Sequence, residues 1–331
     1  MPRIDLEHVE EQWEGREEET ARRPRPASAR RDLASLPVGQ VVGLHKGWVD
    51  VLLDGDELQA VYGGAMRGEP VVVGDRVRLR PPRRPNDRAR VVDRLPRDSV
   101  LLRTADDLVA EERLMAANVD QVIAVVALDE GEVGARFVDR ILVAAEAGGL
   151  DGAVCVNKVD LPGDASDITG RYGRVGYPVV HTSARTGEGL DRLRDLLAGC
   201  WTVMAGHSGV GKTSLSNLLV PGLPRQVGEV GRYGGRHTTA APRALRVPQM
   251  DDAWLVDTPG VRSFGIAHVP PDELATTFPE LRDLDCALPG CLHDGEPGCA
   301  VPRLLGRAVD PARYDSYRRF LTVLQGQPDT P

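Results

Sequence analysis

The sequence lacks a hydrophobic stretch long enough to cross a membrane, because no apolar run approaches the ~18 residues that a spanning helix needs. The residues that follow Met1 are charged, whereas a secretory signal has an apolar core at this place. These two absences lead us to expect a cytoplasmic protein that does not associate with membranes.

Cysteine is scarce as well. The chain has five cysteines, an odd number, and three of them lie between residues 286 and 299. In a chain without a secretory signal, such a late cluster favours a metal site over a set of disulfide bonds.

An excess of positive charge is also missing, since the net charge is -8, which argues against indiscriminate binding to nucleic acids. Arginines nevertheless gather in one stretch of the chain: Arg76, Arg78, Arg80, Arg83, Arg84, Arg88, Arg90, Arg94 and Arg97. Such a run is either ordinary solvated surface or a contact surface for RNA phosphates, and the residues alone leave both interpretations open.

Four segments differ in pattern along the 331 residues. Residues 1–34 are charged and proline-containing and offer no apolar face, which predicts a disordered tail. Residues 35–103 contain short apolar stretches separated by glycine turns, which is typical of an OB-type β-barrel that binds RNA. Residues 104–268 alternate apolar strands with amphipathic helices, which predicts a parallel sheet with helices on both faces. Residues 269–331 carry the cysteine cluster and end in an expected helix from Tyr314 to Leu324.

A complete phosphate-binding loop follows one of the apolar strands and precedes a predicted helix. Its glycines allow backbone N–H groups to wrap the phosphates of a nucleotide, Lys212 reaches the β- and γ-phosphates, and Thr213 ligates Mg²⁺. The loop consists of Gly206, His207, Ser208, Gly209, Val210, Gly211, Lys212, Thr213 and Ser214. This motif does not separate ATP from GTP, and the histidine within it has no evident chemical role.

Two further loops predict that the base is guanine. In Asn157, Lys158, Val159 and Asp160, the carboxylate can accept hydrogen bonds from both the ring N–H and the amino group of guanine, a donor pair that adenine lacks. The alternative for Asp160 is a simple helix cap. A second loop of Thr182, Ser183 and Ala184 follows the next strand, and its Ala184 N–H is expected to contact the guanine carbonyl.

The metal side of the site is expected at Asp257 and Gly260, which follow an apolar strand. Asp257 would hold Mg²⁺ through water, and the Gly260 N–H would contact the γ-phosphate. The next residue is Val261, in a neighbourhood where many GTPases place a water-orienting Gln. The glycine-flanked segment with His237, Thr238 and Thr239 offers two further Mg²⁺ ligands and a residue that could orient water, although His237 could equally be an exposed loop histidine.

The order of these motifs is more informative than any one of them. The base-reading loops at residues 157–160 and 182–184 precede the phosphate loop at 206–214, and the metal side comes last. An ordinary GTPase begins with the phosphate loop, so the order predicts a circularly permuted P-loop GTPase domain.

The late cysteine cluster completes a tetrahedral ligand set. Cys286, Cys291, His293 and Cys299 supply three thiolates and one imidazole, which suits Zn²⁺. Four protein ligands leave no open position, so the metal is expected to be structural. The alternative is three unrelated buried cysteines.

These motifs together resemble the circularly permuted, ribosome-small-subunit-dependent GTPases of bacteria, the RsgA family. The resemblance covers the barrel, the permuted domain and the Cys/Cys/His/Cys segment. It implies a multidomain α/β protein that binds the small ribosomal subunit and its rRNA late in maturation. It further implies that GTP is hydrolysed to GDP and phosphate faster on the subunit, after which the protein leaves.

The resemblance also implies particular roles in this chain. His237 would belong to the catalytic switch together with Lys212 and Gly260, one structural Zn²⁺ would bind per chain, and Mg²⁺ would accompany GTP. The family often has threonine where this chain has Ala240, which leaves open whether Thr238 or Thr239 ligates the metal. We expect a monomer. The alternative function is a GTP-gated RNA-binding switch in which hydrolysis is incidental, which Val261 would permit.

Overall fold

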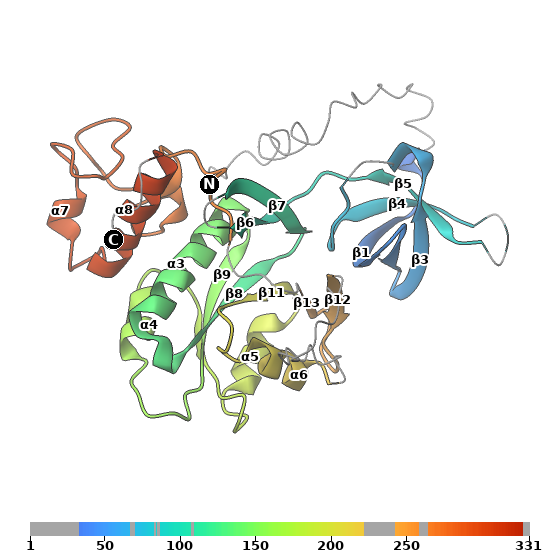
Figure 1. The fold of residues 1–331 in the computed structure, drawn as a ribbon, viewed down its shortest axis with the longest axis horizontal. Helices are drawn as coiled ribbons and strands as arrows, with labels where there is room; N and C mark the ends of the chain where they lie inside the picture. Colours follow the sequence, from blue (N-terminus) through green and yellow to red (C-terminus); the bar gives the residue numbers. More distant parts are fainter. Residues whose placement is uncertain are drawn as a thin grey trace, which may run out of the picture.

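The computed structural model describes residues 33–326 except 67–69, 83, 85–86, 107–108, 222–241 and 258–263. The tail predicted for residues 1–34 thus lies outside the described residues, apart from its last two positions. Figure 1 shows a strand-built part in blue at one end, a central α/β part, and a helical part in red at the other end.

The first part is a closed barrel. Its strands are β1 (Val38–His45), β2 (Trp48–Leu53), β3 (Asp56–Tyr62), β4 (Arg76–Arg80) and β5 (Ala89–Arg94), with a 3₁₀ turn η1 (Gly64–Met66) after β3. They pair in the order β1-β2-β3-β5-β4, and pairing of β1 with β4 closes the ring. Alternate side chains such as Val49, Val51 and Val77 are fully buried inside. The predicted barrel is confirmed.

A hairpin that the sequence did not lead us to expect connects the barrel to the central part. It consists of β6 (Val100–Asp106) and β7 (Val109–Ala117), which form a separate two-stranded sheet. A bridge between Val73 and Ala116 holds it to the barrel, and the Val100 N–H donates to the carbonyl of Gly148 in the central part at 3.0 Å. The hairpin therefore contacts both neighbours.

The central sheet has the order β10-β9-β8-β11-β13-β12. Its members are β8 (Gln121–Ala127), β9 (Asp151–Asn157), β10 (Val179–His181), β11 (Trp201–Ala205), β12 (Arg243–Arg246) and β13 (Trp254–Asp257). All neighbours pair in parallel except β12, which runs antiparallel to β13. At its edge β12 also pairs with β1 at Gly43 and Arg243, so the sheet continues into the barrel.

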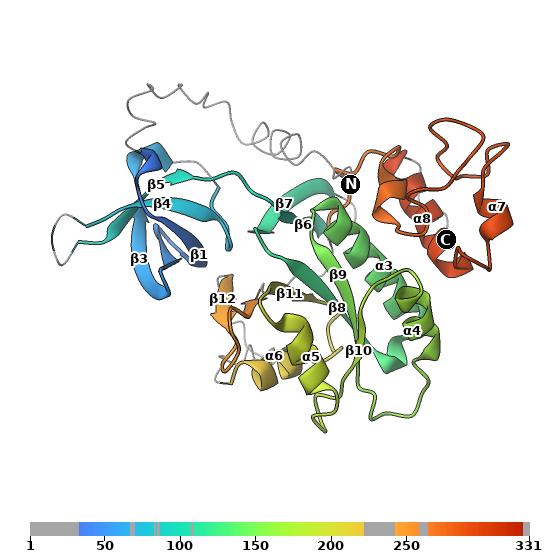
Figure 2. The ribbon, with the colours of Figure 1, turned by 180° about the vertical axis from the view of Figure 1, so that it is seen from behind.

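Helices cover both faces of this sheet, as the alternation predicted. They are α3 (Gly131–Ala147), preceded by the turn η2 (Leu128–Glu130), then α4 (Ser166–Gly173), α5 (Leu190–Leu197) and α6 (Lys212–Leu219). Along β8, Val122 and Val126 face the core that α3 and α4 share, whereas Ile123 and Val125 face the core with α5 and α6. Figure 2 shows α5 and α6 apart from α3 and α4.

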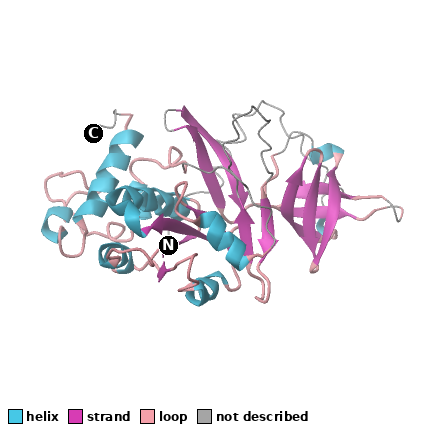
Figure 3. Cartoon of the chain, turned by 60° about the horizontal axis from the view of Figure 1, so that its bottom comes forward, coloured by secondary structure: helices cyan, strands magenta, loops and turns pink. Residues whose placement is uncertain are grey.

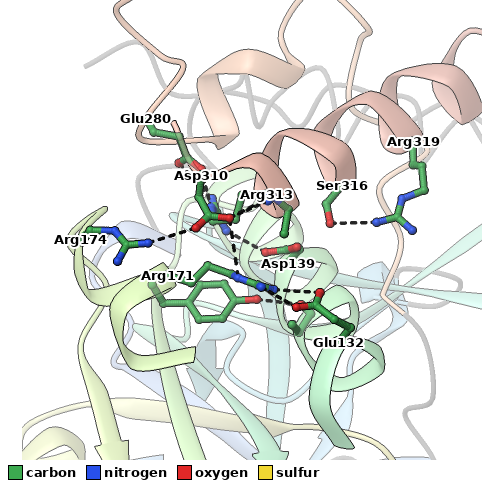
Figure 4. Close-up of polar contacts among 12 residues, drawn as sticks. Glu132, Asp139, Arg171, Arg174, Glu280, Asp310, Arg313, Ser316 and Arg319 are labelled. Carbon is green, nitrogen blue, oxygen red and sulfur yellow. Dashed lines mark hydrogen bonds and ion pairs between the residues drawn. The ribbon is translucent and has the colours of Figure 1, made fainter. Parts of the chain in front are cut away.

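The last part is built from turns and short helices, namely η3 (Leu274–Thr277), α7 (Val301–Leu304) and α8 (Pro311–Leu324). The α8 helix begins at Pro311, earlier than the predicted Tyr314, because the Asp310 side chain caps it by accepting from the Ala312 N–H at 3.0 Å. Arg313 of α8 reaches Asp139 of α3, which attaches this part to the centre (Figure 4).

Figure 3 shows helices around the central sheet and helices joined by long loops near the C-terminus, while the barrel consists almost entirely of strands. Among the described helices, none combines the length and the apolar character needed to cross a bilayer.

Candidate functional site

The phosphate loop connects the carboxyl end of β11 to the first turn of α6. Gly211 has a φ of 99°, and a Cβ added there would lie 2.2 Å from the Asn157 amide nitrogen, so only glycine fits. The Lys212 ammonium donates to the carbonyl oxygens of Gly206 and His207, the latter at 2.7 Å. Burial lowers the pKa of Lys212, and the charge of Glu130 partly opposes this.

The outer side of the loop is open. Ser208, Thr213 and Ser214 are exposed, whereas Val210 is buried beneath them. Thr213 lies in the first turn of α6, where backbone N–H groups have no partner within the helix. A helix N-terminus that follows a glycine loop is suited to phosphate oxygens.

Asn157 joins the three loops that the sequence singled out. Its amide nitrogen donates to the Val210 carbonyl at 2.7 Å, and its amide oxygen accepts from the Thr182 hydroxyl at 3.1 Å and the Ala184 N–H at 3.2 Å. The side chain is 1% exposed. One buried amide thus brings both predicted base loops to the predicted phosphate loop.

Asp160 stands in a turn beside these loops and does not cap a helix. The next helix, α4, begins at Ser166 with Ala165 before it, so the capping alternative is wrong. The Asp160 carboxylate accepts from the Ser183 hydroxyl and from the Arg185 guanidinium, the latter at 2.8 Å. These partners, Ser183 first, lower the pKa of Asp160. The carboxylate is therefore ionised and held in place before any base arrives. Lys158 and Val159 lie on the same turn, where the Val159 N–H donates to Thr182 at 3.2 Å.

Of the residues predicted to bind Mg²⁺, the structure describes Thr213 and Asp257. Asp257 ends β13, which pairs in parallel with β11, so its carboxylate and the phosphate loop share the carboxyl edge of the sheet. Burial raises the pKa of Asp257. His237, Thr238, Thr239 and Gly260 lie outside the described residues.

Two residues near these loops were not singled out from the sequence. Arg185 directly follows the Thr182–Ala184 loop and holds Asp160, and Glu130 lies beside His207. Each comes a few residues after a strand at the carboxyl edge of the sheet, as the base loops and the phosphate loop do, and that position was the available signal.

A cluster of potential metal ligands lies in the C-terminal part. The ligand atoms of Cys286, Cys291, His293 and Cys299 all lie within 4.8 Å of one another. The His293 Nδ1 atom is 3.5 Å from the Cys286 sulfur and 3.6 Å from the Cys299 sulfur. None of the five cysteines forms a disulfide. The alternative of unrelated cysteines is wrong, and this donor set could hold a metal ion.

The surroundings of the cluster fix its backbone. The Tyr314 hydroxyl donates to the His293 carbonyl at 2.7 Å, and the Tyr317 hydroxyl donates to the Leu292 carbonyl. The Ala300 N–H donates to the Cys286 sulfur at 3.2 Å. Such contacts orient the ligands.

The structure separates buried from exposed side chains in the arginine run of the barrel, with Arg76 and Arg78 half-buried and Arg83 outside the described residues. Arg97 is 8% exposed and binds Asp75 at 2.7 Å, and Arg94 is equally buried, so these two stabilise the barrel. Arg80, Arg84, Arg88 and Arg90 are exposed. Arg88 lies 5.0 Å above the ring of Trp48, which stacks on His45 at 3.6 Å. The available cationic surface is therefore smaller than the sequence suggests.

Comparison with known proteins agrees with the motif order. A sequence model of the RsgA GTPase family matches residues 94–267. The "Small ribosomal subunit biogenesis GTPase RsgA" of Gemmatimonas aurantiaca is 36% identical over 292 residues, which cover 85% of this chain and 94% of that protein. The protein of the same name from Pseudomonas aeruginosa is 40% identical over 246 residues, or 71% of this chain and 70% of the relative.

Solved structures show the same architecture. YjeQ from Thermotoga maritima superposes with a TM-score of 0.73 at 30% identity, covering 88% of this chain and 99% of that one. YloQ, described as a circularly permuted GTPase, gives a TM-score of 0.68 at 25% identity over 93% of this chain and 100% of its own. The predicted permuted fold and GTP-hydrolysing activity are thereby confirmed, and this chain belongs to the RsgA GTPase family.

Proposed function

We propose that this GTPase acts on the small ribosomal subunit during its late maturation, as the names of its relatives suggest. It would bind the subunit and its rRNA, hydrolyse GTP to GDP and phosphate faster in that complex, and dissociate. It would work as a monomer in the cytoplasm without a membrane. The observation that best supports the nucleotide site is the junction at Asn157, which unites the base loops with the phosphate loop.

Within this site each group has a definite task. Asp160, oriented by Ser183, would accept the two guanine donors, and the Ala184 N–H would meet the guanine carbonyl. Lys212 would exchange its present carbonyl partners for phosphate oxygens. Thr213, Asp257 and one of Thr238 and Thr239 would hold Mg²⁺, which neutralises phosphate charge when bound. His237 would orient the attacking water, and the Gly260 N–H would contact the γ-phosphate.

We assign the remaining sites by the same chemistry. The Cys286, Cys291, His293 and Cys299 cluster would hold one structural Zn²⁺ per chain, because three thiolates and one imidazole leave it no open position. The exposed Arg80, Arg84, Arg88 and Arg90 of the barrel would contact rRNA phosphates.

The test is hydrolysis of GTP and of ATP by the purified protein, with and without small ribosomal subunits. We expect the subunits to raise kcat for GTP by roughly tenfold or more, equivalent to about 1.4 kcal/mol of barrier, and ATP to remain unhydrolysed. Binding to the subunit with unchanged GTP turnover would favour the second candidate, a GTP-gated RNA-binding switch. This candidate is favoured by Val261, an apolar residue in a neighbourhood where many GTPases place a water-orienting Gln. Equal turnover of ATP would contradict the role of Asp160.

Replacing Asp160 with asparagine tests base recognition directly. The new amide presents one acceptor and one donor to two guanine donors, so one hydrogen bond is lost and two N–H groups face each other. We expect GTP affinity to fall by about 100-fold, measured by displacement of a fluorescent guanine nucleotide.

The matched control is Asp164→Asn. Asp164 lies nearby, and its carboxylate bonds the N–H and hydroxyl of Ser166. GTP affinity is expected to stay at the wild-type value in this variant. If the Asp160→Asn protein binds GTP as tightly as the wild type does, Asp160 does not contact the base.

A further inference from the structure

The His207 side chain turns away from the open side of the phosphate loop and packs on α3. Its ring centroid lies 3.9 Å from that of Phe137. Its Nδ1 atom lies 3.3 Å from a carboxylate oxygen of Glu130, and the side chain is 33% exposed. A histidine held by a ring and a carboxylate is not a freely moving loop residue.

Glu130 is itself fixed at the carboxyl edge of the sheet. Its second oxygen accepts from the Ala127 N–H, the last residue of β8, at 3.1 Å. The Glu130 charge acts on the Lys212 ammonium, whose pKa it raises against the effect of burial. A negative charge that reaches Lys212 also reaches phosphate groups bound by Lys212, and it repels them.

We propose that His207 is a positioning residue that tunes the affinity of the phosphate loop for nucleotide phosphates by offsetting the charge of Glu130. The inference rests on the proposed nucleotide site. When the imidazole is protonated, it forms an ion pair with Glu130 and the repulsion is cancelled. When it is neutral, the Glu130 charge remains. Nucleotide affinity therefore contains a component that is present where the imidazole carries a proton, in acid, and is absent in alkali.

Other charged groups near the ring have partners of their own. The Lys212 ammonium bonds the carbonyls of residues 206 and 207, and Asp129, which precedes Glu130, pairs with Lys158 at 3.4 Å. Phe137, on the α3 side, is uncharged. In the described part of the chain, Glu130 is thus the carboxylate within hydrogen-bonding distance of the His207 imidazole.

The experiment compares GDP affinity of the full-length wild type, His207→Gln and Glu130→Gln between about pH 5.5 and pH 8. Because the terminal phosphate of GDP also titrates, the quantity of interest is the ratio of each variant's Kd to that of the wild type. His207→Gln should bind about fivefold more weakly at the acid end and equally well at the alkaline end. Glu130→Gln should bind about fivefold more tightly at the alkaline end and lose this advantage in acid.

The two opposite pH profiles separate charge compensation from packing. If His207 only fills space against Phe137, His207→Gln weakens GDP binding by the same factor at every pH, and that result overturns the inference while the nucleotide site stands. If the wild type binds no GDP, the proposed nucleotide site fails, and the inference fails with it. Thermal unfolding midpoints of both variants serve as the check that they are folded.

Discussion

Replacing Cys299 with serine is expected to empty the metal centre and to unfold the segment around it. Cys299 is 6% exposed and its sulfur lies 3.6 Å from the His293 Nδ1 atom. Between η3 and α7 the described chain contains turns and bends and no helix or strand, so few backbone hydrogen bonds hold it without the metal. In comparable small zinc modules the metal contributes about 10–16 kcal/mol to folding.

The measurements are zinc content per chain and hydrogen exchange along the sequence. Zinc is expected to fall from about one per chain to a trace, and amides of residues 286–300 to exchange rapidly. The control is Cys200→Ser, because Cys200 is a half-buried cysteine outside the cluster, and this variant should keep its metal. Loss of zinc in both variants, or in neither, would contradict the assignment of these four ligands.

GDP binding should survive the loss of the metal. Asn157, Asp160 and Lys212 are bonded to loops of the central sheet and to no residue of the cysteine segment. A metal-free protein that no longer binds GDP would show that the C-terminal part stabilises the nucleotide site indirectly, through residues that lie between them.

The amino-acid sequence alone was sufficient to predict those strands and motifs that are defined by residues close together in the chain. Apolar runs such as Val122–Leu128 and Gly152–Val156 identified buried strands, and the base loops and the phosphate loop each directly follow a strand. Parallel strands place such residues at one edge of the sheet. The spacing of Cys286, Cys291, His293 and Cys299 was equally informative, because neighbouring ligands must converge on one ion.

Contacts between residues far apart in the sequence could not be predicted from local patterns. Glu130 and His207 are 77 residues apart, and neither local pattern indicates that their side chains meet. For a related reason, the sequence could not separate the buried arginines of the run from the exposed ones. Arg97 is buried because Asp75, which lies 22 residues away, accepts hydrogen bonds from its guanidinium, and composition alone does not show this. The β6–β7 hairpin was missed because its segments carry charged residues within the strands.

Arg313→Ala is expected to be among the most destabilising single substitutions outside the metal centre. Arg313 is 1% exposed and donates to Asp139 of α3 at 2.9 Å and to Glu280 at 3.1 Å (Figure 4). Its guanidinium also lies over the ring of Phe278, 5.0 Å from the centroid. Alanine would remove the guanidinium that both buried carboxylates bind, and breaking such a pair costs about 3–5 kcal/mol. The free energy of unfolding from urea denaturation measures this loss.

Two comparisons make this prediction specific. Arg319 of the same helix pairs with Asp315 at the surface at 3.1 Å, so Arg319→Ala should cost less than about 1 kcal/mol. Burial raises the pKa of Asp139, and the Arg313 charge opposes that rise. Without Arg313 the Asp139 carboxyl binds a proton more readily in the folded state, so the stability deficit of Arg313→Ala should shrink as pH falls.

This network and a contact of the phosphate loop lie on the same helix. Asp139 and Phe137 lie on the same helix, α3, so the helix that receives Arg313 is also the one on which His207 of the phosphate loop packs. If Arg313→Ala lowers stability but leaves GDP affinity unchanged, α3 holds the phosphate loop without help from α8. If both fall while Arg319→Ala changes neither, the C-terminal part contributes to the nucleotide site through α3. Equal destabilisation by the two alanine variants would show that the buried charges in Figure 4 are not what attaches α8 to the central part.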